Sequence, residues 1–139
     1  MSPLMRKIIA SLLAPTLTIA ALAAPAAAAP RLSPDAELAR LLEGRVAGKP
    51  SSCISLMGSP STQIVDRTAL VYRSGRTLWV NHPRAGAESL RDDNILVTRL
   101  YGSQLCRVDP VRLVDRTSGF QRGFVVLGDF VPYRLPPKS

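Results

Sequence analysis

The first 28 residues differ in pattern from the rest, and they decide how much of the chain is available to form a folded domain. Arg6 and Lys7 form a positive start, residues 8–23 are mostly apolar, and the alanines up to Ala29 supply the small side chains that signal peptidases require. This pattern predicts a signal peptide over residues 1–28, with cleavage after Ala28 or within one or two positions of it. An uncleaved N-terminal anchor is the alternative, because the apolar run is long enough to span a bilayer.

Removal of this leader leaves about 110 residues, which is enough for one modest domain with a single core. We therefore expect a single β-rich domain over residues 29–139, with an ordered core at about residues 33–133. Without Arg6 and Lys7, 16 basic residues stand against 10 acidic ones, a net charge of +6. These properties exclude a multidomain enzyme, a polytopic membrane protein, a coiled coil and a wholly disordered chain. The expected localisation is periplasmic or secreted, with no membrane span after cleavage.

The two cysteines, Cys53 and Cys106, agree with export. An even count in a small exported domain favours a disulfide, and two cysteines allow one intramolecular pairing. The bridge would close a loop of about 54 residues, worth ~4 kcal/mol in the chain-entropy model. A catalytic thiol is the alternative, and it is disfavoured because His82 is the only imidazole available to activate one.

One helix is expected at the start of the mature chain. Ser33 is a good N-cap, Pro34 suits the first helical position, and Asp35 and Glu37 complement the positive end of the helix dipole. Gly44 and Gly48, followed by Pro50, are expected to end the helix. Its apolar stripe consists of Leu38, Leu41, Leu42 and Val46.

The remaining residues have the pattern of short β-strands. Segments rich in Val, Ile, Leu, Thr and Tyr alternate with Gly, Pro, Asp and Ser. The strand candidates are residues 53–57, 63–73, 76–81, 95–101, 111–115 and 124–131. The predicted fold is therefore mainly β, a small antiparallel sheet of five or six short strands, barrel- or sandwich-like, with one N-terminal helix.

One hairpin can be predicted in register. With Ser74 and Gly75 as the loop residues, Arg73 faces Arg76 and Tyr72 faces Thr77. Alternation then divides the side chains between two faces: Ala69, Val71, Leu78 and Val80 on one, and Leu70, Tyr72, Thr77 and Trp79 on the other. Both faces are largely apolar, so we expect this hairpin to be covered on both sides, by the sheet and by the helix.

The same hairpin supplies the candidate binding surface, which consists of Tyr72, Arg73, Arg76 and Trp79. Two aromatic rings beside two guanidinium groups would suit a partner. The plainer interpretation is that both arginines point into water at the tip of the hairpin, where isolated charges contribute little.

Candidates for catalysis and metal binding are few. A Ser-His-Asp arrangement would have to use His82, and no nucleophile-elbow motif accompanies it. Asp92-Asp93-Asn94 lacks the spacing of a calcium loop and is more typical of a turn before a strand. We expect no catalytic residues, no metal site and no cofactor.

A short motif occurs twice. Val65-Asp66-Arg67-Thr68 returns as Val114-Asp115-Arg116-Thr117, but the flanking residues do not match well. Chance explains this better than an ancient duplication.

The positive charge is dispersed. Arginine supplies 14 of the 16 basic residues of the mature chain, and these are spread through the sequence. Nucleic-acid binders usually show a dense basic patch with interleaved aromatic residues, and export makes nucleic acid an unsuitable partner. An envelope protein or an anionic envelope polymer is the expected kind of partner.

Four sequence blocks are similar to a family of small exported alphaproteobacterial proteins. These blocks are residues 41–50 (LLEGRVAGKP), 52–56 (SCISL), 102–106 (GSQLC), and 123–133, which contains GDFVPY. The likeness extends from about Leu38 to Tyr133 and is weakest at residues 57–63. It implies that both cysteines lie within recognisable blocks, and it implies no catalytic residues.

The expected role is that of a non-catalytic binding or structural module of the cell envelope. One alternative is a proteinaceous inhibitor of an envelope hydrolase, which would insert the loop at Arg73-Ser74-Gly75-Arg76 into a cleft. A small enzyme that uses Asp92, Asp93 or His82 is a third and weaker hypothesis.

Overall fold

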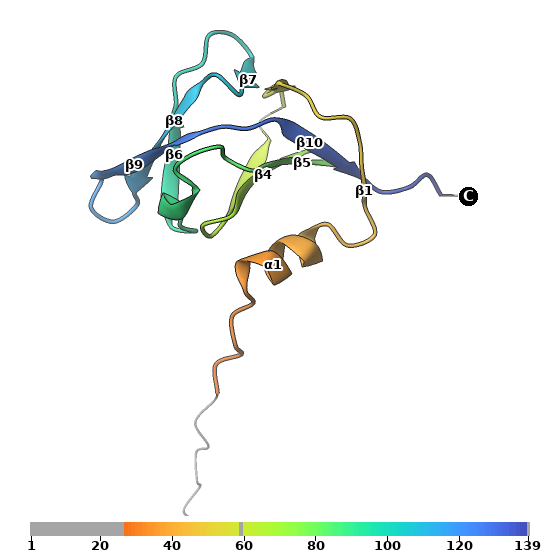
Figure 1. The fold of residues 1–139 in the computed structure, drawn as a ribbon, viewed down its shortest axis with the longest axis horizontal. Coiled ribbons are helices and arrows are strands. Elements are labelled where there is room, and N and C mark those ends of the chain that lie inside the picture. The colour runs from red at the N-terminus through yellow and green to blue at the C-terminus, as the bar shows by residue number, and fades with distance from the viewer. Residues whose placement is uncertain (1–26, 59, 139) are drawn as a thin grey trace, which may run out of the picture. The chain divides into compact units, whose positions relative to one another are not determined.

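The computed structural model describes residues 27–58 and 60–138. The chain divides into two units, Met1–Pro30 and Arg31–Ser139. Residues 1–26, which form most of the predicted signal peptide, lie outside the described residues. Every described helix and strand belongs to the second unit (Figure 1).

The helix α1 (Pro34–Leu41) begins where the sequence predicts it. The Ser33 side chain accepts a hydrogen bond from the Ala36 main-chain N–H at 3.3 Å, which caps the first turn. The helix ends at Leu41, earlier than expected, and the chain turns at Gly44 with a φ of 71°. Val46 is therefore not part of the helical stripe. It lies in a strand and is 62% exposed.

Ten strands and one short 3₁₀ helix make up the rest of the described secondary structure. Their bounds are β1 (Val46–Ala47), β2 (Cys53–Ser55), β3 (Ser61–Val65), β4 (Ala69–Ser74), β5 (Thr77–Asn81), η1 (Ala87–Ser89), β6 (Asn94–Thr98), β7 (Gln104–Cys106), β8 (Pro110–Asp115), β9 (Gln121–Val126) and β10 (Phe130–Arg134). The predicted strand at 63–73 is two strands joined by a turn, and the one at 124–131 spans the end of β9 and the start of β10. The very short β1 and β7 were not predicted, because so few residues carry no periodic signal.

The strands form three antiparallel sheets. Their orders are β1-β10-β5-β4-β3, β2-β7 and β6-β8-β9, and none of these sheets closes into a barrel within the described residues. Figure 1 shows how β9 and β10, joined by a short segment, carry the chain from the three-stranded sheet to the five-stranded one. The prediction of a mainly β, antiparallel fold with one N-terminal helix is confirmed.

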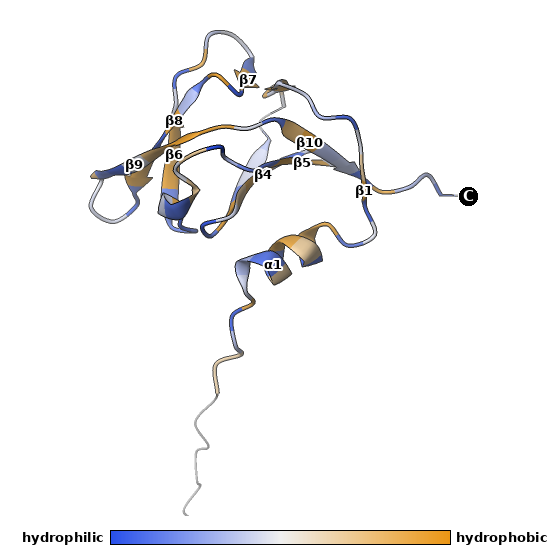
Figure 2. Ribbon diagram, viewed as in Figure 1, coloured by the Kyte–Doolittle hydropathy of each residue, from blue (hydrophilic) through white to orange (hydrophobic). Residues whose placement is uncertain are grey.

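The five-stranded sheet has a hydrophobic cluster on each face. Figure 2 shows the hydrophobic residues along the strands as orange segments of the ribbon. The larger cluster contains Leu70, Tyr72 and Phe130 and continues into the other two sheets. The smaller one contains Ala69, Val71, Val65, Leu78 and Val80, and residues Leu38, Leu41 and Leu42 at the helix pack against it. The prediction that the β4–β5 hairpin is covered on both sides, by sheet and by helix, is confirmed.

The predicted register of this hairpin is wrong by one residue at the turn. Gly75 and Arg76 form the loop, so that Ser74 pairs with Thr77 and Arg73 faces Leu78 instead of Arg76. Gly75 has a φ of 57°, which suits the first central position of a type II′ turn, where glycine is preferred. Moving the turn by one residue changes each partner by two positions, and the assignment of side chains to faces therefore remains correct.

A buried polar contact holds the connection between β9 and β10. Asn81 is fully buried, its Nδ2 donates to the Gly128 carbonyl at 2.7 Å, and its Oδ1 accepts from the Gly128 N–H at 3.0 Å. A Cβ atom on Gly128 would lie 2.4 Å from the His82 carbonyl oxygen, so that only glycine fits here. This contact joins the end of β5 to the start of β10.

Candidate functional site

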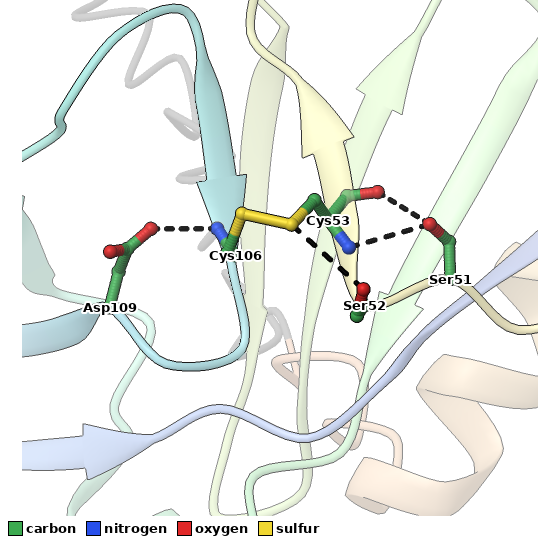
Figure 3. Close-up of a disulfide and its surroundings, with 5 residues drawn as sticks. All are labelled: Ser51, Ser52, Cys53, Cys106 and Asp109. Atoms are coloured by element: carbon green, nitrogen blue, oxygen red, sulfur yellow. Dashed lines mark hydrogen bonds between the residues drawn. A yellow bond between two sulfur atoms is a disulfide. The ribbon is translucent and has the colours of Figure 1, made fainter.

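The two cysteines form a disulfide, with an S–S distance of 2.07 Å. Cys53 and Cys106 face one another across the two-stranded sheet β2–β7 (Figure 3). The Ser51 hydroxyl donates to the Cys53 carbonyl at 2.7 Å, and Asp109 Oδ2 accepts from the Cys106 N–H at 2.7 Å. The bridge thus joins two short strands that would be marginal as an isolated pair.

The structure does not bring the four residues of the predicted binding surface together. Tyr72 is 5% exposed, and its ring meets that of Phe130 edge-on, with a centroid distance of 5.9 Å. This burial raises the pKa of the Tyr72 hydroxyl. Trp79 is half-buried on the same face of the sheet, with the Arg134 guanidinium 6.0 Å from its ring centroid. The prediction of Tyr72 as an accessible binding residue is wrong, because the cover expected on this face of the hairpin buries its ring.

The two hairpin arginines are exposed and lie apart from these rings. Arg73 pairs with Leu78, which places it on the face opposite Tyr72 and Trp79, the face that α1 covers. Arg76 is in the turn, where its carbonyl accepts from Arg45 Nη1 at 2.8 Å. Arg73 and Arg76 are therefore neighbours in sequence with different surroundings.

The remaining sequence candidates are also dispersed. The Asn94 Oδ1 accepts from the Arg91 N–H at 2.9 Å, so Asp92-Asp93-Asn94 builds a turn before β6, as its sequence favoured. His82 is exposed beyond the end of β5. Within residues 27–58 and 60–138, no three His, Cys, Asp or Glu side chains gather closely enough to hold a metal ion. No helix in the described part of the chain is long and apolar enough to cross a membrane.

A large concave site lies between α1 and the strands β3 and β4, and we call it the charged groove. Its volume is about 800 Å³. Six charged residues line it: Arg31, Arg40, Arg73, Glu37, Asp66 and Asp92. Two of the predicted residues, Arg73 and Asp92, thus meet in a site that was not predicted as such.

The acids and the arginines of the charged groove differ in how they are held. Glu37 Oε1 accepts from Gln63 Nε2 at 2.8 Å, and Asp66 Oδ1 accepts from the Asp92 N–H at 2.6 Å. The ion pairs found among the described residues are Arg107–Asp129 and Arg122–Asp115, and neither involves an arginine of this groove. The groove arginines therefore have no carboxylate within ion-pair distance in the described chain.

Two further concave sites continue from the charged groove along β3. The seam, of about 670 Å³, lies between β3 and β6 and shares Glu37, Gln63 and Asp92 with the charged groove. The apolar hollow, of about 320 Å³, follows it and shares Thr62 and Leu96 with the seam. The three sites share lining residues and so form one trough, with the six charged residues of the charged groove at one end and the leucines of the apolar hollow at the other.

Sequence reasoning missed most of this trough. Glu37 was assigned to the helix dipole and Gln63 to a strand, and nothing in their local patterns indicated that they meet. The available signal was the polar start of β3, where Ser61, Thr62 and Gln63 are exposed, as is typical of an edge strand.

Comparison of the chain with protein families, with curated proteins and with solved structures finds no match.

Proposed function

We propose that this chain is an exported, non-catalytic binding module of the cell envelope, and that the charged groove is its main contact surface. The disulfide between Cys53 and Cys106 is compatible with an oxidising compartment. The similarity of its sequence blocks to those of small exported alphaproteobacterial proteins also supports the proposal of export.

The proposal depends on one observation, which is that the arginines of the charged groove are not engaged in ion pairs within the described chain. Arg31, Arg40 and Arg73 line one groove without an ion-pair partner in the described chain. Guanidinium groups bind carboxylates in a forked, directional geometry. An envelope protein with acidic side chains would supply those carboxylates, and an anionic polymer would supply them with less geometric selectivity.

The inhibitor hypothesis is the second candidate, and one observation favours it. The turn at Gly75 and Arg76 is exposed and projects from a hairpin that is packed on both faces, as a rigid inhibitory loop would be. In that case Arg73 and Arg76 would enter the same cleft of an envelope hydrolase.

One pair of matched variants separates the two candidates. Arg73→Glu and Arg76→Glu make the same charge change three residues apart, and both positions are exposed. The disulfide-bonded protein and each variant are immobilised and exposed to an envelope extract, and the affinity for any retained partner is then measured.

Binding through the charged groove predicts that Arg73→Glu weakens partner binding at least about tenfold, whereas Arg76→Glu changes it less than about twofold. The inhibitor hypothesis predicts that both variants lose the partner. If the unmodified protein retains no partner at physiological salt, the proposed binding function is wrong.

A further inference from the structure

Two free sheet edges face the seam. Among residues 27–58 and 60–138, β3 pairs only with β4 and β6 only with β8, so each strand ends its sheet there. Ile64 lines the seam together with Asn94, and Thr62 lines the apolar hollow together with Thr98. The two edges therefore run in opposite directions along the trough. At one end they are joined, because Arg67 N–H donates to the Leu90 carbonyl at 3.2 Å.

The main-chain groups that face the seam follow from the register. The two-residue turn at Gly75 and Arg76 makes its flanking residues a hydrogen-bonded pair. Carrying this alternation across β4 to β3 places the N–H and C=O of Thr62 and Ile64 on the side away from β4. In the described part of the chain these groups have no hydrogen-bond partner in a turn, cap or loop. Such an edge is a template for an added strand.

The seam also contains a buried donor without a partner. Asn94 is 3% exposed and lines the seam, and its buried Nδ2 has no hydrogen-bond partner in the part of the chain that the structure describes. An unmatched buried donor is costly unless something accepts from it. A carbonyl oxygen of a bound main chain would be such an acceptor.

The apolar hollow beside the seam has room for one large side chain. Leu56, Leu96 and Leu105 line it together with Tyr72, Thr62 and Thr98, so that the apolar part of such a side chain would meet the leucines. The Tyr72 ring packs edge-on against Phe130, so this side of the hollow belongs to the larger hydrophobic cluster. Strand-addition sites obtain affinity from main-chain hydrogen bonds and specificity from hollows of this kind.

We propose that the seam binds an extended segment of a partner polypeptide, which pairs with the free edge of β3 and places one large apolar side chain in the apolar hollow. A peptide is the occupant because it supplies a main chain for Thr62 and Ile64, a carbonyl for Asn94 and a side chain for the hollow. This inference rests on the proposed binding function and names the chemical class of the partner.

The test uses synthetic peptides, selected on the full disulfide-bonded protein from a random library displayed on phage. Affinity is measured by fluorescence anisotropy for the protein and for three variants. Thr62→Pro removes the edge N–H, and proline is tolerated at such positions. Thr98→Trp fills the hollow. Val97→Trp is the matched control, since it lies next to Thr98 on the opposite face of β6, opposite Arg112.

We expect Thr62→Pro and Thr98→Trp to weaken peptide binding at least about tenfold and Val97→Trp to change it less than about twofold. Replacement of the large apolar residue of the peptide by alanine should have a similar effect. As a measurement on the unmodified protein, hydrogen exchange at the Thr62 and Ile64 amides should slow when peptide binds. This readout stands even if Thr62→Pro does not fold.

Three results would overturn the inference. The first is that Thr98→Trp leaves peptide binding unchanged. The second is that hydrogen exchange at the Thr62 and Ile64 amides does not respond to peptide. The third is that two copies of the protein pair through β3 and form a dimer that the peptide cannot dissociate. The envelope-extract experiment separates this failure from that of the proposed function. A partner that is lost with Arg73→Glu but retained by Thr62→Pro leaves the binding function standing and removes the seam.

Discussion

Two aspartates of the repeated VDRT motif show how the surroundings of a residue decide its role. Asp115 is 3% exposed, its Oδ1 accepts from the Ser118 N–H at 2.6 Å and from the Thr117 N–H at 3.0 Å, and it pairs with Arg122. Hydrogen bonds from Ser118, above all the main-chain one, lower the pKa of Asp115 from 3.8 to about 2. Asp66, in the same motif, accepts from the Asp92 N–H instead.

This difference predicts a pH dependence for Asp115. A carboxyl whose pKa is lower in the folded state stabilises the protein above its unfolded pKa of 3.8, and this stabilisation is lost as the pH falls toward about 2. Asp115→Asn should therefore lower the unfolding free energy at neutral pH, and the difference from the unmodified protein should shrink over that acid range. Denaturant unfolding at a series of pH values measures it.

Asp129→Asn is the control for this prediction. Asp129 pairs with Arg107 at 2.8 Å, but both side chains are about half exposed, and such surface pairs contribute little. The prediction is contradicted if the difference in unfolding free energy between Asp115→Asn and the unmodified protein does not change with pH.

At the scale of elements, strand ends and turns were predicted less well than strand faces. Both VDRT segments finish a strand and open a hairpin turn, between β3 and β4 and between β8 and β9. Their turns differ, because Arg67 has a φ of 56° and Arg116 has no positive φ. The two VDRT segments thus occupy equivalent positions in their hairpins but differ in conformation. Turns favour residues such as aspartate, so the repeated motif does not require a duplication.

The sheet β2–β7 is small and carries the disulfide. It contains three residue pairs, the main-chain pairing of Ser51 with Phe130 links it to the five-stranded sheet, and Ile54 and Leu105 pack into the larger hydrophobic cluster. Replacement of both cysteines by alanine should lower the unfolding free energy by about 3–4 kcal/mol, because the unfolded chain regains the entropy of the open loop. Denaturant unfolding measures the loss.

The same double variant should open β2–β7 before the rest of the protein unfolds. Hydrogen exchange at Ile54 and Leu105 is therefore expected to rise more than exchange at Val71 and Val80 in the five-stranded sheet. Equal increases at all four amides would show that the bridge stabilises the molecule only globally.

At the scale of the whole molecule, export and oxidation belong to one prediction. The protein recovered from cells should lack residues 1–28, within one or two positions, and should be lighter than the reduced mature chain by its two thiol hydrogens. Intact-mass measurement before and after reduction provides both values. A full-length chain recovered with two free thiols would contradict the expected export and the bridge together.

Features of this protein that depend on near neighbours in the chain could be predicted from its residues. The cap at Ser33 and Pro34, the pairing of two cysteines, the β character of the mature chain and the two faces of the β4–β5 hairpin depend on near neighbours or on counting. Each of these needs no knowledge of distant contacts, since capping and side-chain alternation act over a few residues.

The trough along β3 could not be predicted, because it is formed by elements, such as α1 and β6, that are far apart in the sequence. Its walls come from α1, β3, β4 and β6, and its shape arises because the described sheets leave the edges of β3 and β6 unpaired. Tyr72 is in the core and Arg73 in the charged groove for the same reason. Burial depends on which surfaces meet, and the packing of distant elements sets this, not the alternation along one strand.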